Sequence, residues 1–357
     1  MRKFISYLLF PISILYGIII HIRNKLYDLE ILKSQNHNVI TVGIGNIKVG
    51  GTGKTPHVEF LIELLSKHYK VGVLSRGYKR KTKGFILLNE NDNPLKVGDE
   101  ALQIKNKYPD IPVAVCEDRN KGIKEIKKCI QDIELIILDD VFQHRKLKLD
   151  FSFLLTEYSN PFFKDTILPF GNLRESKKGY KRADYIIVTK TPKNLSMGER
   201  TYFESKLKPK KYQKLFYSNI EYNNAFHLFD KDNMLGSIEN RNIILLTGIA
   251  DNTQIKTYLE DVNSKIIEEI EKADHYNFMN KDIDLIINIY NSHIDKSPII
   301  ITTEKDAVKL REFTEFKEKN IPIFILPITV NLIYSNLKTQ SFEQTLLDDV
   351  RKNKSYG

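Results

Sequence analysis

The chain has 357 residues, of which 41% are hydrophobic and 28% are charged. This length is too great for one ordinary core and suits two α/β domains, and the composition excludes both a disordered chain and a polytopic membrane protein. The 55 Lys and Arg residues outnumber the 45 Asp and Glu residues by 10, which favours an anionic partner such as nucleic acid, a phosphate compound or an anionic membrane. The two cysteines, Cys116 and Cys129, are too few for a disulfide scaffold or a Cys-rich zinc module and indicate a reducing compartment.

The first predicted element is Phe4–Ile22, a stretch of 19 residues without Asp, Glu, Lys or Arg. As a straight helix it would span about 28 Å, barely the width of a bilayer core. Pro11 and Gly17 interrupt it, and no small-residue cleavage site follows, which argues against a removed signal peptide. We expect a membrane anchor that lies in the membrane or crosses it shallowly. The alternative is a core helix of a soluble protein.

From residue 39 onward, short apolar runs alternate with helical patterns. The predicted strands of this first set are Asn38–Ile44, Lys70–Leu74, Ile111–Val115, Glu134–Leu138, Phe151–Leu155 and Tyr185–Val188. The predicted helices are His57–Lys67, Glu100–Lys107 and Lys121–Ile130. This βαβα order predicts an α/β fold with a parallel sheet covered on both faces.

A polar and basic stretch, Lys206–Lys214, predicts a linker to a second set of elements. The predicted strands of this second set are Asn242–Leu246, Pro298–Thr302 and Ile321–Leu326, and its predicted helices lie near Gln254–Leu259 and Asp282–Tyr290. We therefore predict an N-terminal anchor helix at 1–28, a larger domain at 29–214 and a smaller C-terminal α/β domain at 215–357.

The strongest local signal is the run GNIKVGGTGKTP, from Gly45 to Pro56, between a predicted strand and a predicted helix. Closely spaced glycines let backbone N–H groups converge on a phosphate chain, which predicts a P-loop NTPase-like domain at 29–214. Lys54 would reach the β- and γ-phosphates, and the Thr55 hydroxyl would ligate Mg²⁺. A glycine-rich turn with a surface lysine is the structural alternative. The predicted nucleotide-binding residues are Lys48, Val49, Gly50, Gly51, Thr52, Gly53, Lys54 and Thr55.

The predicted strand Glu134–Leu138 ends in two carboxylates, Asp139 and Asp140. In P-loop proteins an aspartate at the end of such a strand holds Mg²⁺, directly or through water. The sequence does not choose between the two aspartates. The residues that follow, FQHR, would lie at the same edge, where open α/β sheets bind ligands.

Two basic runs, residues 75–83 and 174–182, each carry five Lys or Arg side chains. They are compatible with a cleft for an anionic headgroup, with solvated loops or with nucleic-acid contacts. The polar clusters at 274–276 and 302–306 are typical of caps or turns, and the Asp-Glu pair after Gly98 is typical of a helix start. From the residues alone, the chain is a membrane-tethered P-loop protein with an unknown acceptor.

Taken in order, the motifs GNIKVGGTGKTP, SRGYKRK, GDEA, LDDVFQH, LRES, YKRAD, TGIAD, DHYNF and TTEKDAVKL resemble those of the tetraacyldisaccharide 4′-kinases, the lipid A 4′-kinases of Gram-negative bacteria. They run from about residue 43 to 310. Lys48 stands where that family usually has Thr or Ser, and Val141 where Gly is common. The resemblance implies Mg²⁺- and ATP-dependent transfer of the γ-phosphoryl group to the 4′-hydroxyl of tetraacyldisaccharide 1-phosphate, which forms lipid IVA.

The same resemblance implies roles for individual residues. Asp99 would accept the hydroxyl proton, His275 would support it, and Lys54 would act on the transferred phosphate. The implied substrate or nucleotide contacts are Arg76, Tyr78, Arg174 and Glu175. The resemblance also implies a lipid partner and a catalytic portion on the cytoplasmic face of the inner membrane, held peripherally or by a single anchor. We expect a monomer that does not bind nucleic acid.

Two other classes share some of these features. A membrane-tethered P-loop ATPase or GTPase switch, or a transport ATPase, would hydrolyse nucleotide without an acceptor and would give Asp99 and His275 no special role. A nucleic-acid-binding NTPase would suit the net charge. The basic runs, however, lack the interleaved aromatic residues expected of a base-stacking surface.

Overall fold

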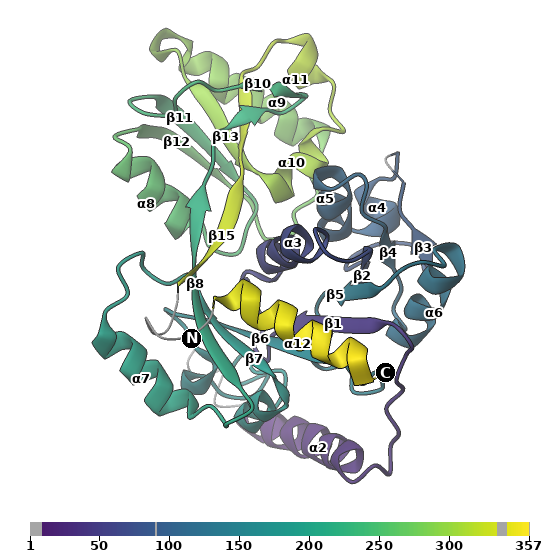
Figure 1. Cartoon of the computed structure of the whole chain (residues 1–357). Coiled ribbons are helices and arrows are strands. Elements are labelled where there is room, and N and C mark those ends of the chain that lie inside the picture. The colour runs from purple at the N-terminus through teal and green to yellow at the C-terminus, as the bar shows by residue number, and fades with distance from the viewer. Residues whose placement is uncertain (1–8, 90, 334–340, 357) are drawn as a thin grey trace.

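The computed structural model describes residues 9–89, 91–333 and 341–356, and these residues fold around two β-sheets (Figure 1). The strands of the larger sheet, in order across it, are β15 (Ile328–Ile333), β8 (Lys214–Tyr222), β7 (Tyr185–Thr189), β6 (Phe151–Glu157), β1 (Ile40–Gly45), β5 (Leu135–Leu138), β2 (Val71–Ser75), β4 (Val113–Val115) and β3 (Ile86–Leu87). Those of the smaller sheet are β10 (Asp230–Met234), β9 (Phe226–His227), β14 (Ile323–Leu326), β13 (Ile299–Thr303), β11 (Asn242–Thr247) and β12 (Lys265–Glu271).

Helices cover both sheets (Figure 1). Those in the part of the chain that builds the larger sheet are α2 (Phe10–Asp28), α3 (Lys54–Leu65), α4 (Pro94–Val97), α5 (Asp99–Lys107), α6 (Arg119–Cys129), α7 (Met197–Leu207) and α12 (Phe342–Tyr356). Those beside the smaller sheet are α8 (Thr253–Asp261), α9 (Asn280–Ser292), α10 (Glu304–Leu310) and α11 (Glu315–Glu318). Short 3₁₀ turns occur at Phe162–Lys164, Lys177–Arg182 and Ile294–Lys296.

The inner strands of the larger sheet are parallel to one another, and every residue of β5 and β7 is buried. Alternate side chains of these strands enter different cores. One core includes residues of α3, α5 and α12, and others include residues of α6 or α7. Continuous apolar strands buried on both faces are typical of a parallel sheet between helical layers. The prediction of an α/β fold with a large parallel sheet is confirmed.

The chain returns to the larger sheet after building the smaller one. β8 pairs in parallel with β7, and β15 pairs antiparallel with β8 over Ile328–Ile333. The predicted linker Lys206–Lys214 covers the end of α7 and the turn into β8. Residues 226–326, which carry the smaller sheet and its helices, are called the second lobe below. The predicted domain boundary at 214/215 stays a prediction.

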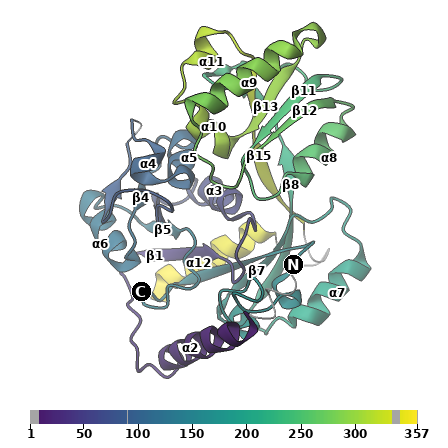
Figure 2. The same ribbon diagram turned by 180° about the vertical axis from the view of Figure 1, so that it is seen from behind.

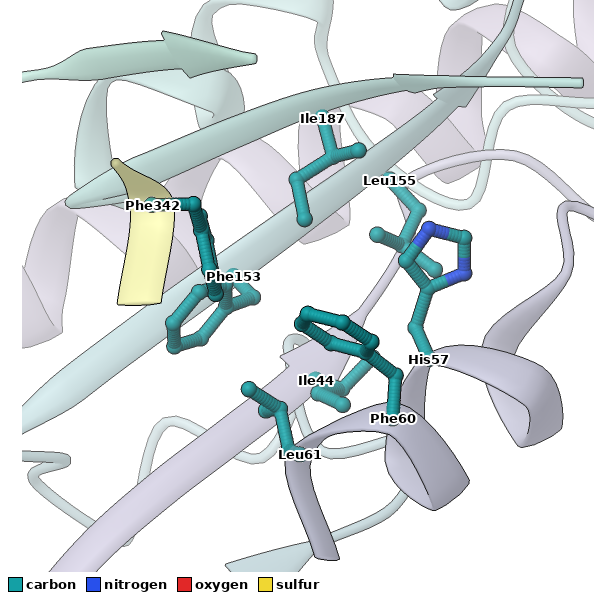
Figure 3. A pocket seen from close by; sticks show the side chains of 8 residues that line it. All are labelled: Ile44, His57, Phe60, Leu61, Phe153, Leu155, Ile187 and Phe342. Carbon is teal, nitrogen blue, oxygen red and sulfur yellow. The ribbon is translucent and has the colours of Figure 1, made fainter. Parts of the chain in front are cut away.

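The C-terminal helix α12 completes the core of the larger sheet. The Phe342 ring packs near Phe153, Phe216 and Phe60. Figure 3 shows this ring facing side chains of β1, β6, β7 and α3 across a small apolar pocket. His57 supplies the only polar side chain among the residues drawn there.

The predicted anchor Phe4–Ile22 begins outside the described residues and overlaps α2, which starts with Pro11 in its first turn. No helix in the described part of the chain is long and apolar enough to cross a membrane. Figure 2 shows α2 at the end of the molecule opposite the second lobe. One set of its apolar side chains is 50–61% exposed, namely Phe10, Ile12, Ile14, Leu15, Ile18, Ile19 and Ile22.

Candidate functional site

The loop between β1 and α3 has the backbone shape of a phosphate cradle. Gly50 and Gly53 have positive φ angles of 122° and 81°, which favour glycine, and Gly53 is the N-cap of α3. Thr52 is buried and fixed from below, since Asn46 Nδ2 donates to its Oγ1 at 2.7 Å and Thr189 Oγ1 donates to its carbonyl at 3.0 Å. Val49 is 45% exposed. The loop is therefore held rigidly on one side and open at a helix N-terminus, which attracts anions.

Lys48, predicted to bind nucleotide, points into the protein. Its Nζ lies 3.0 Å from Asp165 Oδ2 and donates to the Asn160 carbonyl at 3.2 Å. Partial burial raises the pKa of Asp165, but hydrogen bonds, that of Lys48 foremost, lower it to about 2. The ammonium group of Lys48 is therefore paired inside the protein and connects the loop to residues 160–165. A role in phosphate contact stays a prediction.

Lys54, Asp139 and Asp140 come together at the carboxyl ends of β1 and β5. Lys54 Nζ lies 4.0 Å from Asp140 Oδ1, while Arg174 Nη1 donates to both Asp140 oxygens at 2.9 Å. Asp139 is fully buried, and its Oδ1 has no hydrogen-bond partner among the described residues. Burial, followed by the charges of Glu100 and Asp140, raises the pKa of Asp139 to about 7. A buried carboxylate oxygen without a partner fits a cation at this position.

The predicted metal ligands make only a partial coordination sphere by themselves. Thr55 lies in the first turn of α3 and is partly buried. In the residues that the structure describes, no group of three or more His, Cys, Asp or Glu side chains is placed to hold a metal ion. In P-loop sites one hydroxyl and one carboxylate share Mg²⁺ with phosphate oxygens and water. The donor set of Thr55 with Asp139 fits that arrangement.

Asp99 and His275, 176 residues apart in sequence, are hydrogen-bonded to each other. Asp99 opens α5 after Gly98, and His275 lies between β12 and α9 with a positive φ of 58°. His275 Nδ1 is 2.8 Å from Asp99 Oδ2. Burial alone would raise the pKa of Asp99, but the bond from His275 and nearby lysine charges hold it well below its usual range. The structure therefore brings together the pair implied by the family resemblance.

The four implied contact residues lie in different surroundings. Tyr78 is 55% exposed, and its ring centroid lies 5.1 Å from that of His275. Arg174 holds Asp140, as described above. Glu175 is buried and accepts bonds from Gln143, Arg182 and Asn24.

Arg76 is exposed just beyond the end of β2. Burial is the largest cause that lowers the pKa of Arg119 and of His144, and the charge of Arg76 is one of the smaller causes. Tyr78, two residues further on, lies at the Asp99–His275 pair.

Sequence reasoning missed three side chains that contact these groups. Arg119 is fully buried under Asp139 and donates to its carbonyl at 2.9 Å. Lys309 Nζ lies 3.0 Å from Asp99 Oδ2, and Lys305 Nζ lies 3.2 Å from His275 Nε2. The cluster at 302–306 does form the expected cap, since the Thr303 side chain accepts from the Asp306 N–H. The spacing of the two lysines, one helical turn apart, is the signal that marks them.

His57 connects the phosphate loop to β8 beneath the site. Its Nδ1 is 2.7 Å from the Gly53 carbonyl, and its Nε2 is 2.9 Å from Ser218 Oγ. Figure 3 shows the imidazole at the edge of the apolar pocket. Burial, partly offset by the bond to Gly53, lowers the pKa of His57 to about 4.

We expect the buried imidazole of His57 to make folding sensitive to acid. The unfolded chain takes up a proton near pH 6.5, whereas the folded chain does so only near pH 4, so stability is present above pH 6.5 and is lost as the pH falls toward 4. Between pH 7.5 and 5, this group alone should lower the free energy of unfolding by about 2 kcal/mol. Urea unfolding of the wild type and His57→Gln at both pH values measures the difference. Equal losses in the two proteins would contradict the prediction.

Comparison with known proteins gives consistent matches over nearly the whole chain. The model of the family described as Tetraacyldisaccharide-1-P 4′-kinase matches residues 5–351. Proteins called tetraacyldisaccharide 4′-kinase from Flavobacterium johnsoniae and Flavobacterium psychrophilum are each 40% identical, the first over 97% of both chains and the second over 99% of this chain and 100% of its own. A crystal structure of the "apo" form of LpxK from Aquifex aeolicus in complex with ATP aligns with a TM-score of 0.74 at 30% identity, over 98% of this chain and 99% of that one.

Proposed function

The chain belongs to the tetraacyldisaccharide-1-P 4′-kinase family and is a phosphotransferase, and we propose that it transfers the γ-phosphoryl group of ATP to the 4′-hydroxyl of a tetraacyldisaccharide 1-phosphate, giving lipid IVA. The observation that carries this proposal is the Asp99–His275 pair. A switch or transport ATPase needs no base for an acceptor hydroxyl. The pair is joined to the phosphate loop through packed helices, since α5, which begins at Asp99, contacts α3, which begins at Lys54.

The residues of the loop fit the triphosphate of ATP, as the ATP complex of the Aquifex relative supports. The N–H groups of Val49 and Thr52 donate to the carbonyls of Asn172 and Gly50, so the other N–H groups of the loop and of the first turn of α3 would hold the phosphates, and Lys54 would neutralise their charge. Thr55 and Asp139 would hold Mg²⁺, which offsets negative charge on the phosphates during transfer. Because Arg174 already pairs with Asp140, we assign the direct contact with the ion to Asp139.

On the acceptor side, Asp99 would receive the proton of the 4′-hydroxyl. Its Oδ2 accepts from His275, and its Oδ1 accepts from the Glu100 N–H at 3.0 Å. One lone pair of Oδ1 therefore remains for the acceptor hydroxyl. A carboxylate is a weak base, but in phosphoryl transfer with a loose transition state the proton leaves late, so positioning matters more than basicity. The exposed ring of Tyr78 would border the sugar.

We infer that α2 lies in the surface of the inner membrane with its exposed apolar side chains in the lipid. The opposite side of α2 contacts the site: Tyr16 Oη donates to the Arg174 carbonyl at 2.9 Å, and Asn24 Nδ2 donates to Glu175 Oε2 at 3.2 Å. The helix would therefore hold the site close to the surface where a four-chain lipid resides. The basic net charge suits the anionic cytoplasmic leaflet, and the catalytic portion would face the cytoplasm, where ATP is present.

Placing charge on this face should weaken membrane binding. In the double variant Leu15→Glu and Ile18→Glu, two apolar contacts worth about 1.5 kcal/mol each are lost, so partitioning onto anionic vesicles should fall about 100-fold. Vesicle co-sedimentation measures this. The matched control changes two exposed apolar residues of the second lobe, Leu285→Glu and Ile294→Glu, and should bind as the wild type does. Equal binding by all three proteins would exclude α2 as the contact.

The proposed reaction is tested by incubating the protein in detergent with γ-labelled ATP, Mg²⁺ and tetraacyldisaccharide 1-phosphate. We expect the label on the lipid, with little nucleotide hydrolysis when the lipid is left out. ATP hydrolysis at the same rate with and without the lipid, and no labelled lipid, would instead favour the switch or transport ATPase.

A further inference from the structure

Helix α10 of the second lobe carries two lysines on one face. Thr303 caps its first turn, and Lys305 and Lys309 are four residues apart, so both side chains project from the same side of the helix. That side packs against α5, the helix that begins at Asp99 (Figure 1). Both lysines are largely buried, with side chains 18% and 6% exposed.

Each lysine contacts a different member of the Asp99–His275 pair. Lys309 Nζ lies 3.0 Å from Asp99 Oδ2 as an ion pair, without the angle of a directed hydrogen bond. Lys305 Nζ lies 3.2 Å from His275 Nε2 and donates to Asp274 Oδ1 at 2.7 Å. A buried lysine is costly unless a charge or an acceptor compensates it, and here the compensating groups belong to the site.

The contact of Lys305 assigns the tautomer of His275. An ammonium group has only donors, so Nε2 must be the acceptor in this contact. In the neutral imidazole the proton then resides on Nδ1, which donates to Asp99 Oδ2. With Oδ2 engaged by His275 and Lys309, the Oδ1 atom of Asp99 is the one directed to the acceptor.

We propose that Lys305 and Lys309 are positioning residues for the base. Lys305 holds His275 in the tautomer that orients Asp99, and Lys309 holds Asp99 as a carboxylate inside the protein. The inference rests on the proposed kinase function. In the reaction, the 4′-oxygen forms a bond to the γ-phosphorus, the bond from that phosphorus to the β-bridging oxygen breaks, and ADP leaves with the electron pair. The hydroxyl proton moves to Asp99 Oδ1, because His275 Nδ1 already carries one.

The charges around Asp99 predict a pH signature. From the second lobe it faces His275, Lys309, Lys305 and Asp274, and on its own helix Glu100 is the neighbouring charge. Lys309 is the largest of the charge contributions that lower the pKa of Asp99. Without the charge of Lys309, the Asp99 carboxylate is still desolvated by burial but has one fewer positive charge to stabilise it, so the pKa of Asp99 rises.

The kinetic experiment compares Lys309→Met, Lys309→Arg and the control Lys256→Met in phosphoryl transfer between pH 4.5 and 9. Lys256 lies on α8 of the same lobe, and its ion-pair partners are Glu269 and Glu271 rather than Asp99 or His275. For Lys309→Met we expect the acidic limb of the kcat profile to move upward, so that kcat at pH 4.5 falls about threefold or more relative to kcat at pH 8, while KM for ATP stays within about threefold. Lys309→Arg should restore most of the rate, and Lys256→Met should match the wild type.

A second measurement needs no turnover. Long-range ¹H–¹⁵N spectra of protein labelled at histidine, with His275 assigned through His275→Gln, report which ring nitrogen carries the proton. We expect the Nδ1–H form in the wild type and a mixture of tautomers in Lys305→Met.

The two experiments separate the possible failures. A rate of Lys309→Met that is lowered equally at every pH would overturn the role of Lys309, and unchanged His275 signals in Lys305→Met would overturn that of Lys305. A wild type that transfers no phosphate would defeat the proposed function, whereas the His275 spectra would still decide whether Lys305 fixes the tautomer.

Discussion

Asp99→Asn should lower kcat of phosphoryl transfer by about 10²–10⁴-fold, or roughly 3–5 kcal/mol of transition-state stabilisation. An amide has nearly the shape of the carboxylate but cannot accept the hydroxyl proton. The phosphate loop is untouched, so KM for ATP should change by no more than about threefold. The rate of label transfer to tetraacyldisaccharide 1-phosphate at saturating ATP measures the effect.

The control for this variant is Asp132→Asn, because Asp132 is an exposed carboxylate paired with Lys70 and remote from the site. It should transfer phosphate as the wild type does. If Asp99→Asn retained a wild-type rate, Asp99 would not be the base, although the kinase activity itself would stand. A loss in kcat accompanied by an equal loss of ATP binding would show that the variant damages the phosphate site instead.

Lys54→Met should be the second severe variant, with kcat lowered about 10²–10³-fold and weaker ATP binding. Lys54 is only 13% exposed and lies between the loop and Asp140. Methionine keeps the length of the side chain but removes the charge that we propose neutralises the β- and γ-phosphates. Single-turnover transfer and equilibrium binding of a non-hydrolysable ATP analogue separate the two effects.

The matched control is Lys128→Met on the surface of α6, where the lysine is 71% exposed beside Glu125. It should leave both quantities unchanged. A Lys54→Met protein that transferred phosphate normally would contradict the role of Lys54 in neutralising the phosphates.

Local patterns predicted the buried part of the larger sheet well, because each inner strand is an apolar run bounded by polar turns. β5 and β7 lie within about two residues of the predicted Glu134–Leu138 and Tyr185–Val188. β8 and β15 were not predicted. They pair with each other across more than 100 residues, and the polar and apolar residues of β8, KLFYSNIEY, do not alternate strictly. β15, ITVNLI, does alternate, but it follows β14 after one residue and was not separated from it.

The site was predictable in its local parts only. The run GNIKVGGTGKTP and the two aspartates after β5 each follow a strand, so the edge of the sheet brings them together. The pairing of Asp99 with His275 required the family resemblance, since spacing along the chain holds no information about it. The ion pair of Lys48 with Asp165 could not be predicted either, because nothing in the sequence distinguishes a buried lysine next to a phosphate loop from one that faces the phosphates.

The second lobe is joined to the larger sheet at both of its ends, and this lowers the affinity that its contacts with Asp99 need. Both ends of the lobe are joined to the larger sheet, one through β8 and the other through β15, and these strands pair with each other. The encounter of His275, Lys305 and Lys309 with Asp99 is therefore intramolecular. Flexible tethers give effective concentrations in the millimolar range, and two paired strands restrict the lobe further. Contacts too weak to hold two separate proteins together are then sufficient to keep His275, Lys305 and Lys309 at Asp99.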